Sequence, residues 1–199
     1  MLPKRLIARG IGYPLPVLLR LALLIRSHFN DEPIDALLSF SHYTLQNDTL
    51  KQYAPHFIDR AGVKQLYCAS PLNMGFFSPR VPEWHMAPPG MREPREQAIK
   101  VVQSENWPGG LADLALGFGL RRDRLGGDTN GNLLSFSIPT VVGLSSLEEV
   151  HHAVRVWHEV NSPRLKDDDE RRVSLERRVK KCFVETGWSN WSWDSGNGT

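Results

Sequence analysis

The sequence has little cysteine, little net charge and no long hydrophobic run, and each shortage excludes a class of protein. Its two cysteines cannot form a disulfide framework, so we expect a reducing compartment such as the cytoplasm. A net charge of +2 provides no general attraction to nucleic acid or to membranes, and neither is an expected partner. The apolar run 15–25 contains Arg20 and is too short to cross a bilayer. With 41% hydrophobic and 23% charged residues, residues 1–199 are predicted to form one globular domain.

Candidate strands and helices alternate along the chain. We expect strands at residues 5–12, 34–40, 64–69 and 137–142, and helices at residues 14–30, 47–60, 92–106, 111–122, 146–160 and 165–185. This alternation predicts the α/β class, with four parallel strands joined by crossover connections. The apolar strand 34–40 is typical of a sheet that is covered on both faces.

The N-terminal region could be read either as a buried helix or as a targeting segment. The second reading arises because the basic residues Lys4, Arg5 and Arg9 precede the apolar run, as in a signal peptide. No small-residue cleavage site follows, which favours a buried helix over a signal peptide. Its apolar face is predicted from leucine and isoleucine at helical spacing, at Leu18, Leu21, Leu24 and Ile25.

The stretch 64–78, KQLYCASPLNMGFFS, is the most informative part of the chain. A strand ends at Ser70-Pro71-Leu72, since proline cannot donate to a strand partner, and Gly75 lets the backbone approach a ligand closely. A parallel strand that stops on such a loop usually leads to a binding site. The loop 73–92 is rich in proline and glycine, and we expect a functional, mobile flap.

The C-terminal third contains a predicted helix start and a highly charged helix. Ser146 and Glu149 have the spacing of a capping box. The helix 165–185 alternates charges of both signs, which predicts a solvated face with Val173, Val179 and Phe183 as inner positions.

Two reactive candidates in the sequence are weak. Glu148 and His151 are too few for a metal site, and His152 points about 100° away from His151 on a helix, so no metal is expected. Cys68 lies in an apolar strand, where a thiol remains protonated and a poor nucleophile.

Several segments in order resemble the aldo/keto reductases. They are GYPLPVLLRLALLI, LLSFSHYTLQNDTL, VKQLYCASPLNMGFF, PEWHMAPP, WPGGLADLALGF, IPTVVGLSSLEEV and the WSW tail. The resemblance implies a (β/α)8 TIM-type barrel, of which residues 1–199 would be the C-terminal half, strands five to eight, ending in the tail 187–199. The catalytic Asp, Tyr, Lys and His of that family come from the first half, so no catalytic residue is expected here, and His42 and Tyr43 match none of those motifs.

The same resemblance implies cofactor-binding residues. Four residues would lie along the cofactor pyrophosphate: Ser70, Pro71, Leu72 and Gly75. The loop after the last strand would hold the adenosine side through Gly143, Leu144, Ser145 and Ser146, with Glu149 at the adenine ribose or base. Departures from the family pattern are Ile11 and Gly12 at the nicotinamide amide position, Ala69 in place of a stacking aromatic, and Ala153 in place of an adenine-binding Asn.

NAD is expected in preference to NADP, because residues 143–150 contain no basic side chain for a 2′-phosphate, and Arg155 is predicted to lie too far along the helix. The implied activity is oxidation of an aldose such as D-arabinose to its lactone, and the chain alone is expected to be inactive. The alternative is a non-catalytic nucleotide-binding or interaction protein built on a half barrel. Open sheet edges make self-association an expected property.

Overall fold

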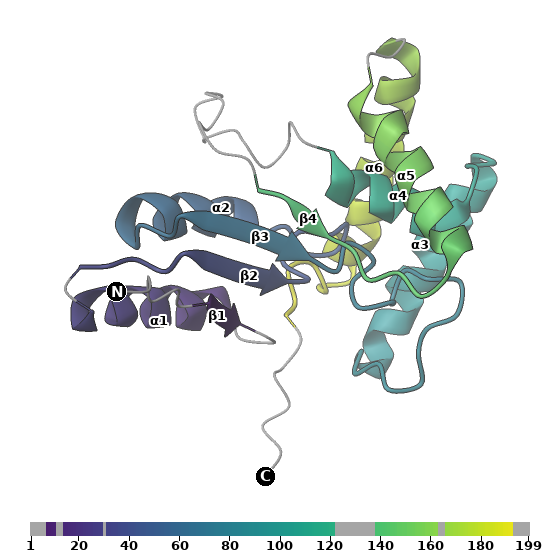
Figure 1. Cartoon of the computed structure of the whole chain (residues 1–199). Helices are drawn as coiled ribbons and strands as arrows, with labels where there is room; N and C mark the ends of the chain where they lie inside the picture. Colours follow the sequence, from purple (N-terminus) through teal and green to yellow (C-terminus); the bar gives the residue numbers. More distant parts are fainter. Residues whose placement is uncertain (1–6, 11–13, 30, 122–137, 163–165, 193–199) are drawn as a thin grey trace.

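The chain folds around a parallel sheet, shown in the computed structural model of Figure 1. The structure describes residues 7–10, 14–29, 31–121, 138–162 and 166–192. The strands β1 (Ile7–Gly10), β2 (Ala36–Phe40), β3 (Gln65–Ala69) and β4 (Thr140–Val141) lie in the order β1-β2-β3-β4, and every pair is parallel. The predicted α/β class is confirmed. The fourth strand is shorter than predicted, and Pro139, which has no N–H, directly precedes it.

The helices are α1 (Leu15–His28), α2 (Leu50–Pro55), α3 (Arg92–Ser104), α4 (Gly110–Leu120), α5 (Leu147–Asn161) and α6 (Lys166–Glu185). In Figure 1, α1 and α2 flank the strands, whereas α3 to α6 gather beyond the carboxyl ends of the strands. Pro55 lies where the helical pattern changes from α2 to a π-helical turn, His56–Arg60. Among the helices described, none combines the length and hydrophobicity needed to cross a membrane.

Among the described residues, the packing covers one face of the sheet more than the other, contrary to the prediction for residues 34–40. Leu37 and Ser39 of β2 are buried on the covered face, and Leu37 belongs to the main hydrophobic core with Leu66 of β3. The alternate residues of β2, Ala36, Leu38 and Phe40, are only half-buried. An alternating pattern of this kind is typical of a sheet with one face packed.

Helix α1 is likewise less buried than its sequence predicts. Leu18 is buried with Leu15 and Ala22, but Leu21 is 41% exposed and Leu24 is 43% exposed. The apolar sequence of α1 therefore exceeds what this fold covers, because the helix contacts the rest of the molecule along a narrow stripe.

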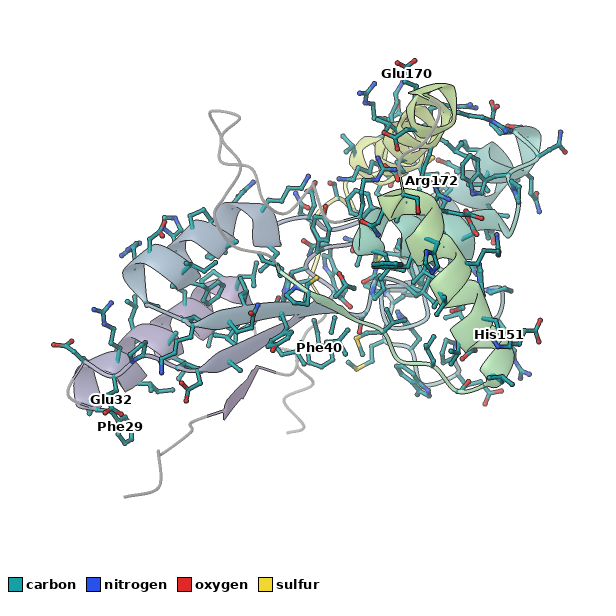
Figure 2. All side chains as sticks on the ribbon, turned by 45° about the horizontal axis from the view of Figure 1, so that its top comes forward. Phe29, Glu32, Phe40, His151, Glu170 and Arg172 are labelled. Carbon is teal, nitrogen blue, oxygen red and sulfur yellow. The ribbon has the colours of Figure 1, made fainter. Side chains whose placement is uncertain are left out.

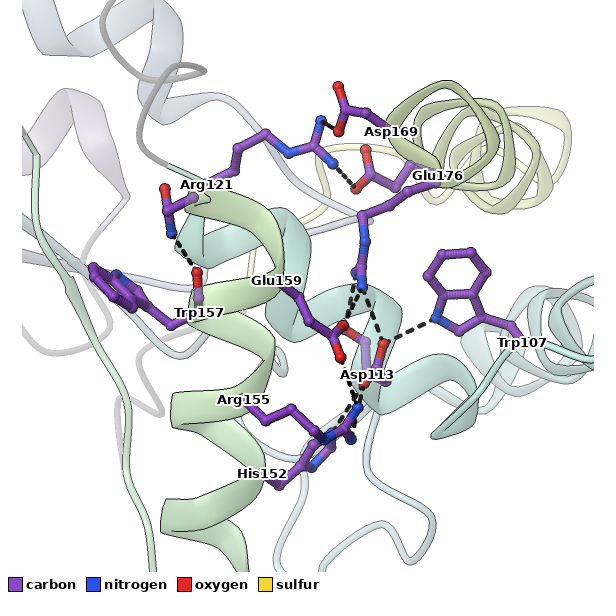
Figure 3. Close-up of polar contacts among 11 residues, drawn as sticks. Trp107, Asp113, Arg121, His152, Arg155, Trp157, Glu159, Asp169 and Glu176 are labelled. Atoms are coloured by element: carbon purple, nitrogen blue, oxygen red, sulfur yellow. Dashed lines mark hydrogen bonds and ion pairs between the residues drawn. The ribbon is translucent and has the colours of Figure 1, made fainter. Parts of the chain in front are cut away.

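Helix α6 is more deeply embedded than its charge pattern predicts. Val179 and Phe183 are fully buried, as expected, but so are the charged residues Arg172 and Glu176. Arg172 lies 3.3 Å from Asp113 of α4, and Glu176 lies 3.4 Å from Arg121. Figure 3 shows this network between α4, α5 and α6. Buried charges need such partners, so the solvated-face prediction is wrong for these two positions.

The loop 73–92 is packed against the body of the protein. His85 bonds the carbonyl of Asn73 through Nε2 at 3.1 Å, and its Nδ1 accepts from the N–H of Ala87, which defines a neutral tautomer. Arg95 of α3 donates to the carbonyls of Phe76 and Ser78 at 2.6 Å and 2.8 Å. The contacts of Arg95 hold the start of the loop against α3, whereas Trp84 and Met86 further along it are exposed; the mobility expected of this loop stays a prediction.

Candidate functional site

An open cleft of about 1490 Å³ lies at the carboxyl ends of β2, β3 and β4. Its walls come from three loops that follow these strands, from α4 and from the start of α5. All of the expected cofactor-binding residues line it: Ser70, Pro71, Leu72, Gly75, Gly143, Leu144, Ser145, Ser146 and Glu149. Two segments that are far apart in the sequence therefore meet at one cavity. Figure 2 shows Phe40 at the end of β2 that points toward α3 to α6, and Phe40 also lines the cleft.

Two serines turn the chain from strand to loop beside this cleft. Ser41 follows β2 with φ of 55°, and Ser70 follows β3 with φ of 62°. The N–H of Ser41 donates to the carbonyl of Ala69, and the N–H of Ser70 donates to the carbonyl of Val141. Left-handed backbone at residues other than glycine is strained, and strain of this kind concentrates at functional sites. The neighbouring strand holds each serine in this conformation.

The Ser70-Pro71-Leu72 segment continues as a tight turn. The N–H of Asn73 donates to the carbonyl of Ser70 at 2.8 Å, and the N–H of Gly75 donates to the carbonyl of Leu72 at 3.1 Å. Gly75 has φ of 92°, and a Cβ at this position would lie only 3.0 Å from Pro82. Glycine is required here both for the backbone conformation and for the approach of Pro82.

The start of α5 places a carboxylate in the cleft. The N–H of Glu149 donates to Ser146 Oγ at 3.2 Å, as predicted. The Glu149 carboxylate accepts from the N–H of Ser145 at 2.6 Å and from its hydroxyl at 2.9 Å. It thus returns to the residue before the N-cap, one position earlier than in a regular capping box. The backbone N–H of Ser145, more than any other contact, lowers the pKa of Glu149, so this wall of the cleft is acidic.

Two buried polar residues, Ser41 and His42, form another part of the cleft. The sequence analysis assigned His42 no role, because it matches none of the catalytic motifs. His42 and Ser41 line the cleft and are both buried. His42 Nδ1 lies 2.9 Å from Ser39 Oγ, and burial lowers the pKa of His42 to about 4. Within the described part of the chain, Ser41 Oγ is buried without a hydrogen-bond partner. A neutral imidazole and an unsatisfied hydroxyl are suited to binding a polar, uncharged ligand group.

A basic side chain also reaches the cleft, which corrects the prediction about Arg155. Arg155 and His152 line the wall formed by α5. His152 Nε2 lies 3.1 Å from Asp113, and Arg155 donates to Asp113 at 3.5 Å and to Glu159 at 3.0 Å. Figure 3 shows both side chains turned toward Asp113. The guanidinium of Arg155 therefore already pairs with two carboxylates, which it shares with Arg172.

The C-terminal segment closes one end of the site. Gln46 Nε2 donates to the carbonyls of Trp188 and Trp191, and Asn47 Nδ2 donates to the carbonyl of Trp191. Ser192 lines the cleft. The loop after β2 thus holds the chain beyond α6 beside the cleft by hydrogen bonds between polar side chains and backbone. The remainder of the tail 187–199 lies outside the described residues.

Comparison with known proteins identifies relatives of about twice this length. A D-arabinose 1-dehydrogenase of Saccharomyces cerevisiae is 28% identical over 184 residues, which are 90% of this chain and 51% of the relative. An L-galactose dehydrogenase of Arabidopsis thaliana is 27% identical over 164 residues, 82% of this chain and 44% of the relative. This chain is similar to the aldo/keto reductases. The chain spans about half the length of the curated relatives it matches, and no family model matches it.

A solved aldo-keto reductase of Bacillus halodurans gives a TM-score of 0.49 in both of its forms. The holo form is 14% identical, and the matched region covers 94% of this chain and 51% of the holo-form chain. The apo form is 13% identical, and the matched region covers 95% of this chain and 63% of the apo-form chain.

Two positions that depart from the aldo/keto reductase pattern are buried. Ala69 is buried at the end of β3, and Ala153 packs with Leu116 and Val156 in a small core between α4 and α5. Neither lines the cleft. Ile11 and Gly12, the third departure, lie outside the described residues. The described residues contain no group of three or more His, Cys, Asp or Glu side chains placed to hold a metal ion.

The donors and acceptors of the cleft can be compared with those that a nicotinamide dinucleotide would require. Glu149 would offer a carboxylate to ribose hydroxyls, and the buried hydroxyl of Ser41 has no hydrogen-bond partner among the described residues. Gly143 faces open space, since a Cβ there would have no atom within 4 Å. The N–H groups at a helix N-terminus suit phosphate, although Glu149 already occupies that of Ser145.

Proposed function

We propose that this chain binds a nicotinamide dinucleotide in the cleft, as the cofactor-binding half of an aldo/keto reductase barrel. In this assignment β1 to β4 correspond to strands five to eight of the (β/α)8 fold. The observation that carries the proposal is that two sets of residues expected from the sequence to contact one cofactor line a single cleft: Ser70, Pro71, Leu72 and Gly75, and Gly143, Leu144, Ser145, Ser146 and Glu149. The position of the cleft, at the carboxyl ends of parallel strands, is typical of ligand sites in such folds.

Each segment has a defined task in this proposal. The turn at Ser70 to Gly75 would lie along the pyrophosphate, and the loop at Gly143 to Ser146 would hold the adenosine. Glu149 would accept hydrogen bonds from the adenine ribose. The bound cofactor would supply the hydride chemistry, while the protein residues position it and exclude water.

A blocking variant tests the site without disturbing the fold. Gly143→Val adds a side chain where the structure has open space, so the melting temperature should stay unchanged while the added bulk enters the cleft. We expect calorimetric titration of NAD⁺ to detect binding to the original chain and a loss of at least about tenfold in the variant. Glu170→Gln, an exposed change on α6, is the matched control. Absence of NAD⁺ binding, or equal binding by the variant, would exclude this cleft as the site.

The proposal includes a preference for NAD over NADP. A 2′-phosphate beside the ribose would meet Glu149, and Arg155 is already paired with Asp113 and Glu159. Glu149→Gln should therefore improve NADP⁺ binding relative to NAD⁺ by roughly tenfold or more, because it removes a like-charge repulsion. Parallel titrations of the two nucleotides measure this ratio. Tighter binding of NADP⁺ than of NAD⁺ by the original chain would refute the preference.

The proposed substrate is an aldose such as D-arabinose, oxidised at C1 to its lactone in the cytoplasm. The acid/base residues that the family uses for this step have no match in residues 1–199, so catalysis needs a first half that supplies them. The alternative is a nucleotide-binding protein without catalysis. Adding a first-half fragment of the yeast relative distinguishes them, because only the first proposal predicts that NAD⁺ reduction appears.

A further inference from the structure

The loop after β2 carries a buried hydroxyl that the fold leaves without a hydrogen bond. Ser41 is 3% exposed and lines the cleft, and within the described residues its Oγ has no hydrogen-bond partner. Burial of a hydroxyl without a partner costs free energy, so such a group in a folded protein needs an explanation. Because Ser41 belongs to the cleft wall, a ligand bound in the cleft can supply the missing hydrogen bond.

His42, the next residue, adds a second polar group to the same wall. It is 6% exposed and lines the cleft, and its Nδ1 lies 2.9 Å from Ser39 Oγ. The bond to Ser39 uses Nδ1, so Nε2 is the ring nitrogen left to bond a ligand. Burial lowers the pKa of His42 to about 4, and the imidazole is therefore uncharged near pH 7. An uncharged imidazole beside a hydroxyl suits a neutral ligand group that both donates and accepts hydrogen bonds.

The order of the strands determines which part of a dinucleotide would reach these two residues. The N–H of Ser70 donates to the carbonyl of Val141, and the N–H of Ser41 donates to the carbonyl of Ala69. The loops after β4, β3 and β2 therefore leave the sheet side by side, at the strand spacing of about 5 Å. In the proposed function, the adenosine lies at the first of these loops and the pyrophosphate at the second. The nicotinamide half, which follows the pyrophosphate in the molecule, would then extend to the loop after β2.

The chemistry of the nicotinamide ring matches this end of the cleft. Its carboxamide is uncharged and planar, with one carbonyl acceptor and an NH₂ donor. Phe40 precedes Ser41 at the end of β2, lines the cleft and is half-buried, so it offers an apolar ring surface beside the polar pair (Figure 2). Ile11 and Gly12, the positions that the family resemblance assigns to this amide, have no polar side chain. The amide therefore needs partners from another segment.

On the basis of the proposed function, we infer that Ser41 and His42 bind the carboxamide of the nicotinamide ring and that Phe40 packs against the ring. The Ser41 hydroxyl and His42 Nε2 bond the carbonyl and the NH₂ group of the amide. Ser39 acts as a positioning residue, because its bond to Nδ1 fixes the orientation of the imidazole. The hydroxyl that the fold leaves unsatisfied thus gains its partner only when the cofactor is bound.

Calorimetric titration of Ser41→Ala with NAD⁺ and with ADP-ribose, which lacks the nicotinamide ring, tests this inference. We expect the affinity for NAD⁺ to fall about three- to tenfold, because one hydrogen bond is lost, and the affinity for ADP-ribose to stay unchanged. The melting temperature without nucleotide should stay the same or rise, since the variant removes a buried hydroxyl that has no partner. Ser104→Ala, the same chemical change at an exposed position of α3, is the matched control and should bind both nucleotides as the original chain does.

His42→Phe, which keeps a planar ring without its nitrogen atoms, should show the same selective loss of NAD⁺ affinity, with its fold checked by circular dichroism. Equal losses for NAD⁺ and ADP-ribose in Ser41→Ala would place the contact on the part that the two nucleotides share and would overturn the inference. Unchanged NAD⁺ affinity, with weaker binding of D-arabinose to the NAD⁺-saturated protein, would assign the pair to the sugar and would overturn it as well. Unchanged affinity for all three ligands would leave Ser41 without a binding role. If neither nucleotide binds the original chain, the proposed function itself is refuted and this assignment with it.

Discussion

At the scale of single residues, the unusual feature is how much polarity is buried around the cleft. His42 and Ser39 form a buried pair on one side, and Asp113 with Arg172 forms a buried ion pair on the other. A buried polar group is stable only when it is satisfied, and a single deletion leaves its partner uncompensated. The chemistry of the cleft and the stability of the fold therefore depend on some of the same side chains.

His42 should make the protein acid-sensitive. Burial lowers the pKa of His42 to about 4 in the folded protein from 6.5 in the unfolded chain. Below pH 6.5 the unfolded chain takes up the proton first, so the free energy of unfolding falls as the pH decreases toward 4. The loss attributable to this residue approaches about 3 kcal/mol. Denaturant titrations across this range should show the slope, and His42→Gln should flatten it; an identical slope in the variant would contradict the assignment.

Arg172 should be among the most sensitive positions for stability. Removal of its guanidinium leaves the buried carboxylate of Asp113 without its α6 partner and also loses the contact with Glu159 at 3.4 Å. We expect Arg172→Ala to lower the free energy of unfolding by about 3–5 kcal/mol. Arg177→Ala, an exposed arginine on the same helix, should cost less than about 0.5 kcal/mol. Equal effects in urea denaturation would show that the network contributes little.

At the scale of elements, the close approach of α4 to the loop after β3 positions the cleft. Gly119 of α4 faces Pro71, and Gly117 faces Arg172, with no room for a Cβ at either position. Gly119 thus lets α4 approach the Ser70-Pro71-Leu72 turn, and Gly117 lets it approach Arg172 of α6. The turn after β3, which shapes the proposed pyrophosphate site, is therefore held in place by its contact with α4.

Gly119→Ala should destabilise the protein although alanine favours a helix by about 1 kcal/mol. The new methyl group would overlap Pro71, and overpacking costs about 1–3 kcal/mol. Thermal unfolding should show a lower melting temperature, together with weaker NAD⁺ binding because the turn moves. Gly143→Ala, the same chemical change in open space, is the control and should melt as the original chain does. A raised melting temperature for Gly119→Ala would mean that the turn yields easily.

At the scale of the whole molecule, a cofactor cleft does not by itself make an oxidoreductase. Hydride transfer to or from a sugar needs a group that moves a proton, and such groups contribute roughly 10² to 10⁴ in rate. His42, whose pKa is lowered to about 4, is neutral near pH 7 and paired with Ser39.

We therefore expect residues 1–199 alone to lack dehydrogenase activity. The assay is NAD⁺ reduction with D-arabinose and with L-galactose, using protein whose mass has been measured by light scattering. The full-length yeast relative serves as the positive control. Turnover by the purified chain, above the rate of a Gly143→Val sample prepared in parallel, would contradict this expectation.

Much of the local structure followed from the sequence. Proline and glycine signals predicted the strand end at Ser70, and Ser146 was predicted to cap α5, because these effects act over a few residues. The buried state of Cys68 was also predictable from its apolar strand, and burial raises the pKa of its thiol to about 11. The predicted class, α/β with parallel strands, rests on the alternation of elements and is confirmed.

Only the tertiary structure decided which apolar and charged residues are covered. Leu21 and Leu24 have the spacing of a buried face but are exposed, while Arg172 and Glu176 have the pattern of a solvated face but are buried. Periodicity defines the faces of a helix, whereas burial depends on which distant element packs against each face, and Asp113 and Arg121 are such distant partners. The same reason explains Arg155, which the contacts of α5 with α4 bring to the cleft despite its distance along the chain.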